Sequence, residues 1–101
     1  MMGYYTNYTL SVQNANGQES EIEERIQGIS GYTGLSFDSV YNCKWYNRFT
    51  DMETVSKEFP DVILFLEGDG EEQGDVWKAI FKNGRSKVVK PEVVWPELKL
   101  D

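Results

Sequence analysis

Residues 76–90, VWKAIFKNGRSKVVK, contain the dipeptide Asn83-Gly84 between two runs in which apolar and polar side chains alternate. This dipeptide is typical of a two-residue β-hairpin turn, because both of its residues must adopt a positive φ. Pairing about such a turn predicts three cross-strand neighbours: Trp77 with Lys90, Ala79 with Val88, and Phe81 with Ser86. One face of the hairpin is then apolar, and the other carries a basic stripe. The stripe comprises Lys78, Lys82, Arg85 and Lys87, with Ile80 among them.

The segment before the hairpin predicts a helix and then a buried strand. Thr50 and Glu53 have the spacing of a capping box, which begins a helix. The apolar stripe of this helix comprises Met52, Val55 and Phe59. Pro60 ends the helix, because the residue before a proline avoids the helical conformation. Residues 62–66, VILFL, form the longest apolar run and predict a central strand that is covered on both faces.

The N-terminal part predicts a half-buried strand and a second helix. Between residues 4 and 12, Tyr, Thr, Tyr, Leu and Val alternate with smaller or polar side chains, as in a strand with one buried face. Isoleucines then recur at Ile22, Ile26 and Ile29, which predicts a helix from about residue 20 to residue 29. Ser20 with Glu23 could cap its start, and Gly28 or Gly31 could end it.

Two short strands are expected between the helices, near residues 35–37 and 41–46. In the second of these, Tyr41, Cys43 and Trp45 share one face. The predicted order is strand, helix, strand, strand, helix, strand and an extra C-terminal hairpin. Two helices on one face of an antiparallel sheet predict an α+β, ferredoxin-like fold. Residues 91–101, with two prolines, are expected to form an extended tail whose Val94 and Trp95 pack back on the domain.

The composition predicts one domain that binds rather than catalyses. A chain of 101 residues is too short for two stable cores. The absence of histidine removes the usual neutral-pH general base, the Ser-His and Cys-His pairs and most zinc sites. The single cysteine, Cys43, cannot form an internal disulfide and is expected to be buried and inert. No cofactor is expected.

The chain carries no pattern of a membrane or secreted protein. No stretch approaches the about 18 apolar residues of a membrane span, and the N-terminus lacks a signal-peptide pattern. We therefore expect a cytoplasmic protein.

The net charge of −7 is distributed unevenly along the chain. Residues 1–75 carry fourteen acidic and four basic side chains, whereas residues 76–91 carry five basic and no acidic ones. Because duplex DNA repels an acidic surface, free nucleic acid is not the expected partner of most of this protein. A basic protein surface matches the charge better.

The densest acidic run lies in residues 67–75, EGDGEEQGD, between two predicted strands. Its carboxylates are Glu67, Asp69, Glu71, Glu72 and Asp75. Clustered oxygens can bind calcium or magnesium, but the spacing does not match an EF-hand loop. A solvated connection that keeps strand edges from pairing with other chains is the favoured alternative, and no metal site is predicted.

A second interpretation of the same run is mimicry of nucleic acid. Carboxylates at phosphate-like spacing can occupy a nucleic-acid-binding groove on another protein. The first helix adds a second acidic cluster, formed by Glu19, Glu21, Glu23 and Glu24. The candidate partner-binding residues are therefore the five carboxylates of residues 67–75 together with Glu21 and Glu24. Acidity that only maintains solubility is the alternative.

The sequence offers two further candidate sites, the basic stripe and the carboxylate pairs. The basic stripe of the hairpin could contact RNA or DNA, but it lacks the stacking aromatics of RNA-recognition modules, so a solvated, ion-paired face is favoured. Carboxylate pairs in residues 67–75 lie in a Gly-rich loop with nothing to raise the pKa of one relative to the other, as acid–base catalysis requires. No catalytic residues are predicted.

Residues 44–85, KWYNRFTDMETVSKEFPDVILFLEGDGEEQGDVWKAIFKNGR, resemble a segment shared by small phage, plasmid and prophage proteins. The resemblance rests on a Lys-Trp-Tyr strand, the DM…SK.FPDV passage and the pattern GEGEE.GD.W…F.NG. This chain departs from the pattern at Asp69, where glutamate is usual. The related Api92-like proteins carry a similar ferredoxin-like domain.

The resemblance implies a mobile-element context but no enzyme activity. Small acidic phage proteins often inhibit host defence, including anti-CRISPR proteins that occupy nucleic-acid-handling surfaces of Cas effectors. The leading hypothesis is therefore an inhibitor of this kind, with a host defence protein such as a Cas effector subunit as its partner. The alternative is an accessory module of phage DNA metabolism that binds nucleic acid through the basic stripe. The oligomeric state is left open.

Overall fold

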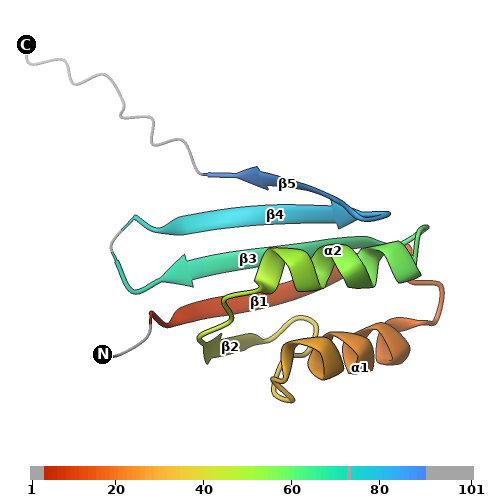
Figure 1. The fold of residues 1–101 in the computed structure, drawn as a ribbon, viewed down its shortest axis with the longest axis horizontal. Helices are drawn as coiled ribbons and strands as arrows, with labels where there is room; N and C mark the ends of the chain where they lie inside the picture. Colours follow the sequence, from red (N-terminus) through yellow and green to blue (C-terminus); the bar gives the residue numbers. More distant parts are fainter. Residues whose placement is uncertain (1–3, 73, 91–101) are drawn as a thin grey trace, which may run out of the picture.

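The computed structural model describes residues 4–72 and 74–90, which form a five-stranded antiparallel sheet with both helices on one face (Figure 1). The elements are β1 (Thr6–Gln13), α1 (Glu19–Ser30), β2 (Val40–Cys43), α2 (Arg48–Glu58), β3 (Ile63–Gly70), β4 (Val76–Lys82) and β5 (Arg85–Val89). The strand order across the sheet is β2-β1-β3-β4-β5. The mixed α+β class and the antiparallel sheet are confirmed.

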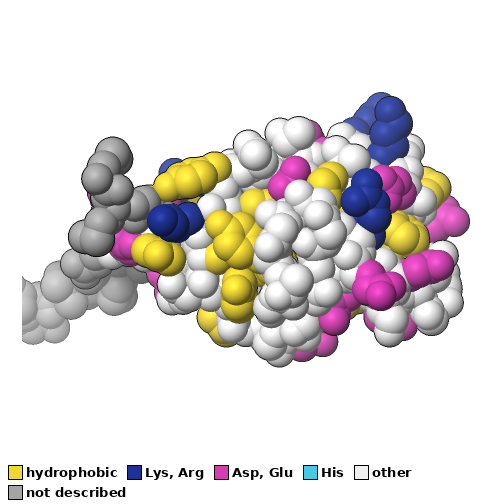
Figure 2. All heavy atoms as spheres, turned by 60° about the horizontal axis from the view of Figure 1, so that its bottom comes forward, with side chains coloured by type: hydrophobic (Ala, Val, Ile, Leu, Met, Phe, Trp, Pro, Cys, Tyr) yellow, Lys and Arg dark blue, Asp and Glu magenta, His cyan; other side chains and the backbone are white. Residues whose placement is uncertain are grey.

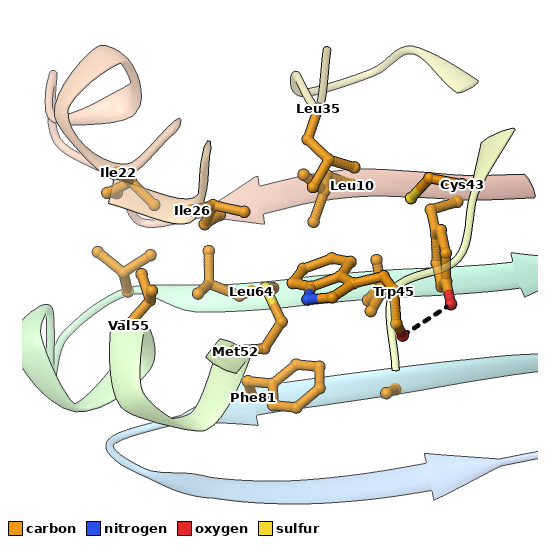
Figure 3. Packing of buried hydrophobic residues seen from close by; sticks show 14 of the residues in the cluster. Leu10, Ile22, Ile26, Leu35, Cys43, Trp45, Met52, Val55, Leu64 and Phe81 are labelled. Atoms are coloured by element: carbon orange, nitrogen blue, oxygen red, sulfur yellow. Dashed lines mark hydrogen bonds between the residues drawn. The ribbon is translucent and has the colours of Figure 1, made fainter. Parts of the chain in front are cut away.

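The core lies between the sheet and the two helices. Alternate residues of the central strands point into it, including Tyr8 and Leu10 of β1, and the helices contribute Ile22, Ile26, Met52 and Val55. Figure 3 shows the side chains of Leu10 from the sheet and of Ile22, Ile26, Met52 and Val55 from the helices pointing toward one another. The isoleucine and Met52–Val55 stripes therefore face the core as predicted. The buried Tyr8 hydroxyl also donates a hydrogen bond to the Trp45 carbonyl at 3.3 Å.

The hairpin is confirmed, with one difference in register. Asn83 and Gly84 adopt positive φ values of 48° and 80°. Ala79 pairs with Val88 and Phe81 with Ser86, as expected. The predicted Trp77–Lys90 pair does not form, because β5 ends at Val89.

The predicted order of elements is wrong between the helices. Residues 35–37 form no strand and contribute only an isolated parallel bridge between Leu10 and Phe37. The Leu35 carbonyl instead accepts a hydrogen bond of 2.7 Å from the side chain of Gln27 in α1. One strand, β2, therefore separates the helices where two were expected, so the element order differs from the ferredoxin-like order.

Both helices begin before the predicted caps. The N-cap of α1 is Gln18 and that of α2 is Asn47, and neither side chain makes a capping hydrogen bond. Ser20 and Thr50 therefore lie inside the first turns. The predicted ends are closer: Gly31, at φ 83°, closes α1 by donating its N–H to the Gln27 carbonyl, and α2 ends at Glu58, before Pro60.

The acidic run is not simply a loop, because β3 continues through Gly70. The alternation of the strand is maintained: Leu66, Gly68 and Gly70 point to the helix side, and Glu67 and Asp69 point away from it. Gly68 is required there, since a Cβ at this position would collide with the Trp77 ring. The first two carboxylates of the run are therefore fixed on a strand.

Candidate binding site on the open sheet face

The sheet face opposite the helices, here named the open face, carries a hollow of about 700 Å³. Among residues 4–72 and 74–90, neither helix packs over this face (Figure 1). The apolar lining comprises Val40, Phe65, Val76, Ile80 and Val89. The polar lining comprises Asn7, Thr9, Glu67, Asp69 and Lys78. The prediction that both faces of residues 62–66 are covered is therefore wrong for Ile63 and Phe65, which are only half-buried.

The register of the strands explains this lining. The pairing of β3 with β4 places Phe65 beside Ile80 and Asp69 beside Val76. Val89 joins from the edge strand, where it pairs with Lys78. The apolar side chains thus come from distant parts of the sequence and meet only when the sheet forms.

Glu67 and Asp69 differ in their environment within the hollow. A carboxylate oxygen of Glu67 lies 3.5 Å from Lys78 Nζ, and about half of each side chain is exposed. An ion pair in this setting contributes at most about 1 kcal/mol of stability. The Asp69 side chain makes no hydrogen bond or ion pair with another residue of the described ranges. Its charge is therefore available to a partner.

The turn between β3 and β4 is tied to the N-terminal segment. The Tyr4 hydroxyl donates to Asp75 Oδ2 at 2.7 Å and accepts the Glu72 N–H at 2.9 Å. The Tyr5 N–H donates to Glu71 Oε1 at 2.7 Å. The hydrogen bond to Asp75 raises the pKa of Tyr4, because it stabilises the protonated hydroxyl. Glu71 and Asp75 thus have a structural role in addition to their charge.

Glu21 and Glu24 lie at the other end of the molecule. They are exposed on α1, which starts beyond the end of β1 that is remote from the β3–β4 turn. Eight strand residues separate the two ends, which corresponds to roughly 25 Å at the usual rise of a strand. Figure 2 shows acidic side chains gathered at the end that carries the start of α1. The structure therefore does not bring the two acidic clusters together.

The basic stripe is confirmed on the open face but is not one continuous patch of free charge. Lys78 is paired with Glu67, and Lys82 donates to the Pro60 carbonyl at 3.3 Å. The side chains of Arg85 and Lys87 remain exposed on β5 and make no hydrogen bond or ion pair within the described ranges. Two cations at the sheet edge are thus left for a partner.

Metal binding and thiol chemistry find no support in this geometry. The part of the chain that the structure describes contains no group of three side chains that could hold a metal ion. Cys43 is buried, and burial raises the pKa of its thiol to about 11. A thiol with so high a pKa is a poor nucleophile near neutral pH.

The sequence predicted the charges of this site but not its apolar part. The missed residues are Val40, Phe65, Val76, Ile80 and Val89, together with Asn7 and Thr9. One signal was present: Phe65 and Ile80 are apolar at positions that alternation assigns to the outer face.

Comparisons with known proteins do not assign this surface. No family model, no curated protein and no solved structure matches the chain. Among the described helices, none is long and apolar enough to cross a membrane. A function is therefore inferred from the surface itself.

Proposed function

We propose that this protein is a non-enzymatic acidic binding protein whose open face docks on a basic surface of another protein. The contact surface comprises the hollow and the acidic end, which we define as Glu67, Asp69, Glu71, Glu72 and Asp75. One observation supports this most directly: Glu67 and Asp69 line the same hollow as the apolar Phe65 and Val76. Apolar contact and negative charge are thus available to one partner on one surface.

The chemistry of the hollow favours a protein over free nucleic acid. Apolar side chains that can be desolvated supply affinity at protein interfaces, and complementary charge supplies orientation and association rate. Phosphates would be repelled by Asp69 and by the net charge of −7. A partner with lysines or arginines around an apolar protrusion fits both features.

The expected partner is a nucleic-acid-binding surface of a host defence protein, such as a Cas effector subunit. This expectation comes from the resemblance of residues 44–85 to phage and prophage proteins, and it makes the protein an anti-defence inhibitor of the anti-CRISPR type. The implied relation to ferredoxin-like domains belongs to the same proposal and extends only to the layers, an antiparallel sheet with both helices on one face, because the order of the elements differs.

The separation of the acidic clusters makes the proposal more specific. A partner that contacted both clusters would have to span the sheet, so we assign the principal contact to the acidic end. Glu21 and Glu24 then take part only in long-range attraction, which salt screens over about 10 Å at moderate ionic strength.

The test compares two double charge reversals in binding and cleavage assays with purified Cas effector complexes. D69K/E72K changes two acidic-end side chains that form no side-chain hydrogen bond or ion pair within the described ranges. E21K/E24K is the matched control, with the same change in net charge on α1. We expect the first variant to lose inhibition and salt-sensitive binding, while the second retains most of both.

Three outcomes would contradict the proposal. Equal loss in both variants would indicate only general electrostatics, and unchanged binding by D69K/E72K, with an intact circular dichroism spectrum, would exclude the acidic end. Failure of the unaltered protein to bind any effector complex would remove the anti-defence assignment.

A second candidate function is direct binding of nucleic acid, favoured by the exposed Arg85 and Lys87 on β5. Such binding would weaken steeply with salt and would be lost in R85E/K87E. A gel-shift series at increasing salt separates the two functions, because a protein that acts only as an inhibitor should shift no nucleic acid at any salt concentration.

A further inference from the structure

The chain contains the dipeptide Asn-Gly twice, at Asn16-Gly17 between β1 and α1 and at Asn83-Gly84 between β4 and β5. The two turns have nearly the same backbone conformation. The φ values are 52° and 84° in the first turn and 48° and 80° in the second. Both asparagines are exposed. The two dipeptides differ instead in what the glycine N–H contacts.

The turn at Asn83-Gly84 is tied to α2. The Gly84 N–H donates a hydrogen bond of 2.9 Å to the Ser56 hydroxyl. Ser56 is fully buried, and its hydroxyl donates in turn to the Glu53 carbonyl at 2.8 Å. The flanking residues Lys82 and Arg85 pair with each other in the ladder between β4 and β5. This dipeptide is therefore restrained on both sides and from the helix.

The turn at Asn16-Gly17 is held less firmly. The Gly17 N–H has no acceptor among residues 4–72 and 74–90, and Gly17 is exposed. One hydrogen bond closes the turn, from the Gln18 N–H to the Ala15 carbonyl at 3.0 Å. No atom lies within 4 Å of the position that a Cβ would take at Gly17. The surroundings therefore leave this dipeptide room to change conformation.

The glycine N–H matters because Asn-Gly dipeptides deamidate in water. The deprotonated glycine nitrogen attacks the asparagine Cγ, a cyclic succinimide forms, and the side-chain amide leaves as ammonia. Water then opens the ring at either carbonyl and gives aspartate or isoaspartate, so water is the only co-reactant. Glycine hinders the attack least, because it has no Cβ. A hydrogen bond from the glycine N–H opposes both the loss of its proton and the rotation that brings the nitrogen to Cγ.

We propose that Asn16 is a site of spontaneous deamidation in the folded protein, and that Ser56 protects Asn83 from the same reaction. The reaction adds a carboxylate just before Gln18, the N-cap of α1, where the helix dipole favours negative charge. The isoaspartate product also lengthens the main chain between β1 and α1 by one methylene group. The site is independent of the function proposed above.

Peptide mass spectrometry of the unaltered protein after incubation at mildly alkaline pH tests the difference between the two sites. The mass difference between an amide and a carboxyl group measures the conversion at each position. We expect Asn16 to convert at least several-fold faster than Asn83 in the folded protein. In urea, where both turns are lost, the two rates should become similar. Equal rates in the folded protein, or a difference of the same size in urea, would overturn the proposal.

Ser56→Ala tests the protecting contact, with Thr54→Ala as the matched control. The Thr54 hydroxyl also belongs to α2 and donates to a carbonyl of that helix, the one of Thr50, but it makes no hydrogen bond to the turn. Ser56→Ala should raise the conversion rate at Asn83 several-fold and leave the rate at Asn16 unchanged, whereas Thr54→Ala should change neither. An unchanged rate at Asn83 in a folded Ser56→Ala protein would contradict the role of Ser56.

Hydrogen exchange of the two glycine amides gives a measure that needs no substitution. In the unaltered protein, the Gly84 N–H should exchange with solvent at least several-fold more slowly than the Gly17 N–H, because only the former is hydrogen-bonded. Equal or faster exchange at Gly84 would overturn the proposal, even if Ser56→Ala did not fold.

Discussion

The two faces of the sheet are built from alternate residues of the same strands, yet they have opposite properties. On the helix side, Leu64 and Leu66 of β3 are fully buried. On the open face, their neighbours Phe65 and Glu67 remain partly or largely exposed and line a hollow. The covered face buries the core of the fold, and the open face can therefore carry charged and apolar side chains that solvent reaches.

The difference also explains why the acidic run can be part of a strand. Gly68 sits on the covered side against Trp77, while Asp69 sits on the open side next to Val76. Packing against Trp77 holds the strand from one side, and the Asp69 carboxylate on the other side has no side-chain partner among the described residues. Buried packing and an exposed charge are thus separated by one residue along the chain.

Truncation of neighbouring residues on opposite faces should give the largest contrast. Leu64→Ala removes a fully buried side chain and should lower the free energy of unfolding by about 3 kcal/mol. Phe65→Ala removes a half-buried ring and should lower it by only about 1 kcal/mol. Urea denaturation measures both values, and a cost for Phe65→Ala equal to that of Leu64→Ala would show that the open face is covered in solution.

Adding a methyl group to the covered side of the acidic run should be the next most costly change. In Gly68→Ala the new Cβ would meet the Trp77 ring, which packs against Tyr8 and Phe49 and cannot move freely. We expect a loss of about 2–3 kcal/mol in thermal or urea unfolding, as for an overpacked core. Gly74→Ala is a contrasting variant. At its φ of 87° any side chain strains the backbone, but nothing lies within 4 Å of the new Cβ, so it involves no steric clash. Gly68 has no positive φ, so a Gly68→Ala protein as stable as the unaltered one would contradict the clash with Trp77.

The covered face was more predictable from the sequence than the open face, for physical reasons. The turn at Asn83-Gly84 and the isoleucine stripe of α1 depend on neighbours within a few residues, and local patterns report them. The strand expected at residues 35–37 failed because its backbone is held by the Gln27 side chain rather than by a ladder. Such a contact has no periodic signature.

The hollow could not be predicted because its parts meet through long-range register. Phe65 and Ile80 are fifteen positions apart and become neighbours only through the pairing of β3 with β4. The continuation of β3 was hidden by Gly68 and Gly70, which indicate a loop unless the rings of Trp77 and Tyr4 are known to lie over them. The acidic run itself is apparent in the sequence, whereas the placement of Glu67 and Asp69 beside the hollow is not.

Alkaline pH should weaken the covered face through Cys43. Burial raises the pKa of this thiol from 9.0 to about 11, so the folded protein holds the proton more tightly than the unfolded chain does. The resulting stabilisation is complete below pH 9 and is lost as the pH rises toward 11, with a total of about 2–3 kcal/mol. The free energy of unfolding should fall over this window more steeply for the unaltered protein than for Cys43→Ala. Parallel curves for the two proteins would contradict this role of burial.

The ion pair on the open face should contribute least. Glu67 and Lys78 are 3.5 Å apart and half-exposed, so solvent and salt screen their attraction. A double-mutant cycle with Glu67→Gln and Lys78→Met should give a coupling energy of about 0.5 kcal/mol or less, which decreases further at high salt. A coupling well above 1 kcal/mol, insensitive to salt, would show that this pair is shielded from water and would contradict an open face that solvent reaches.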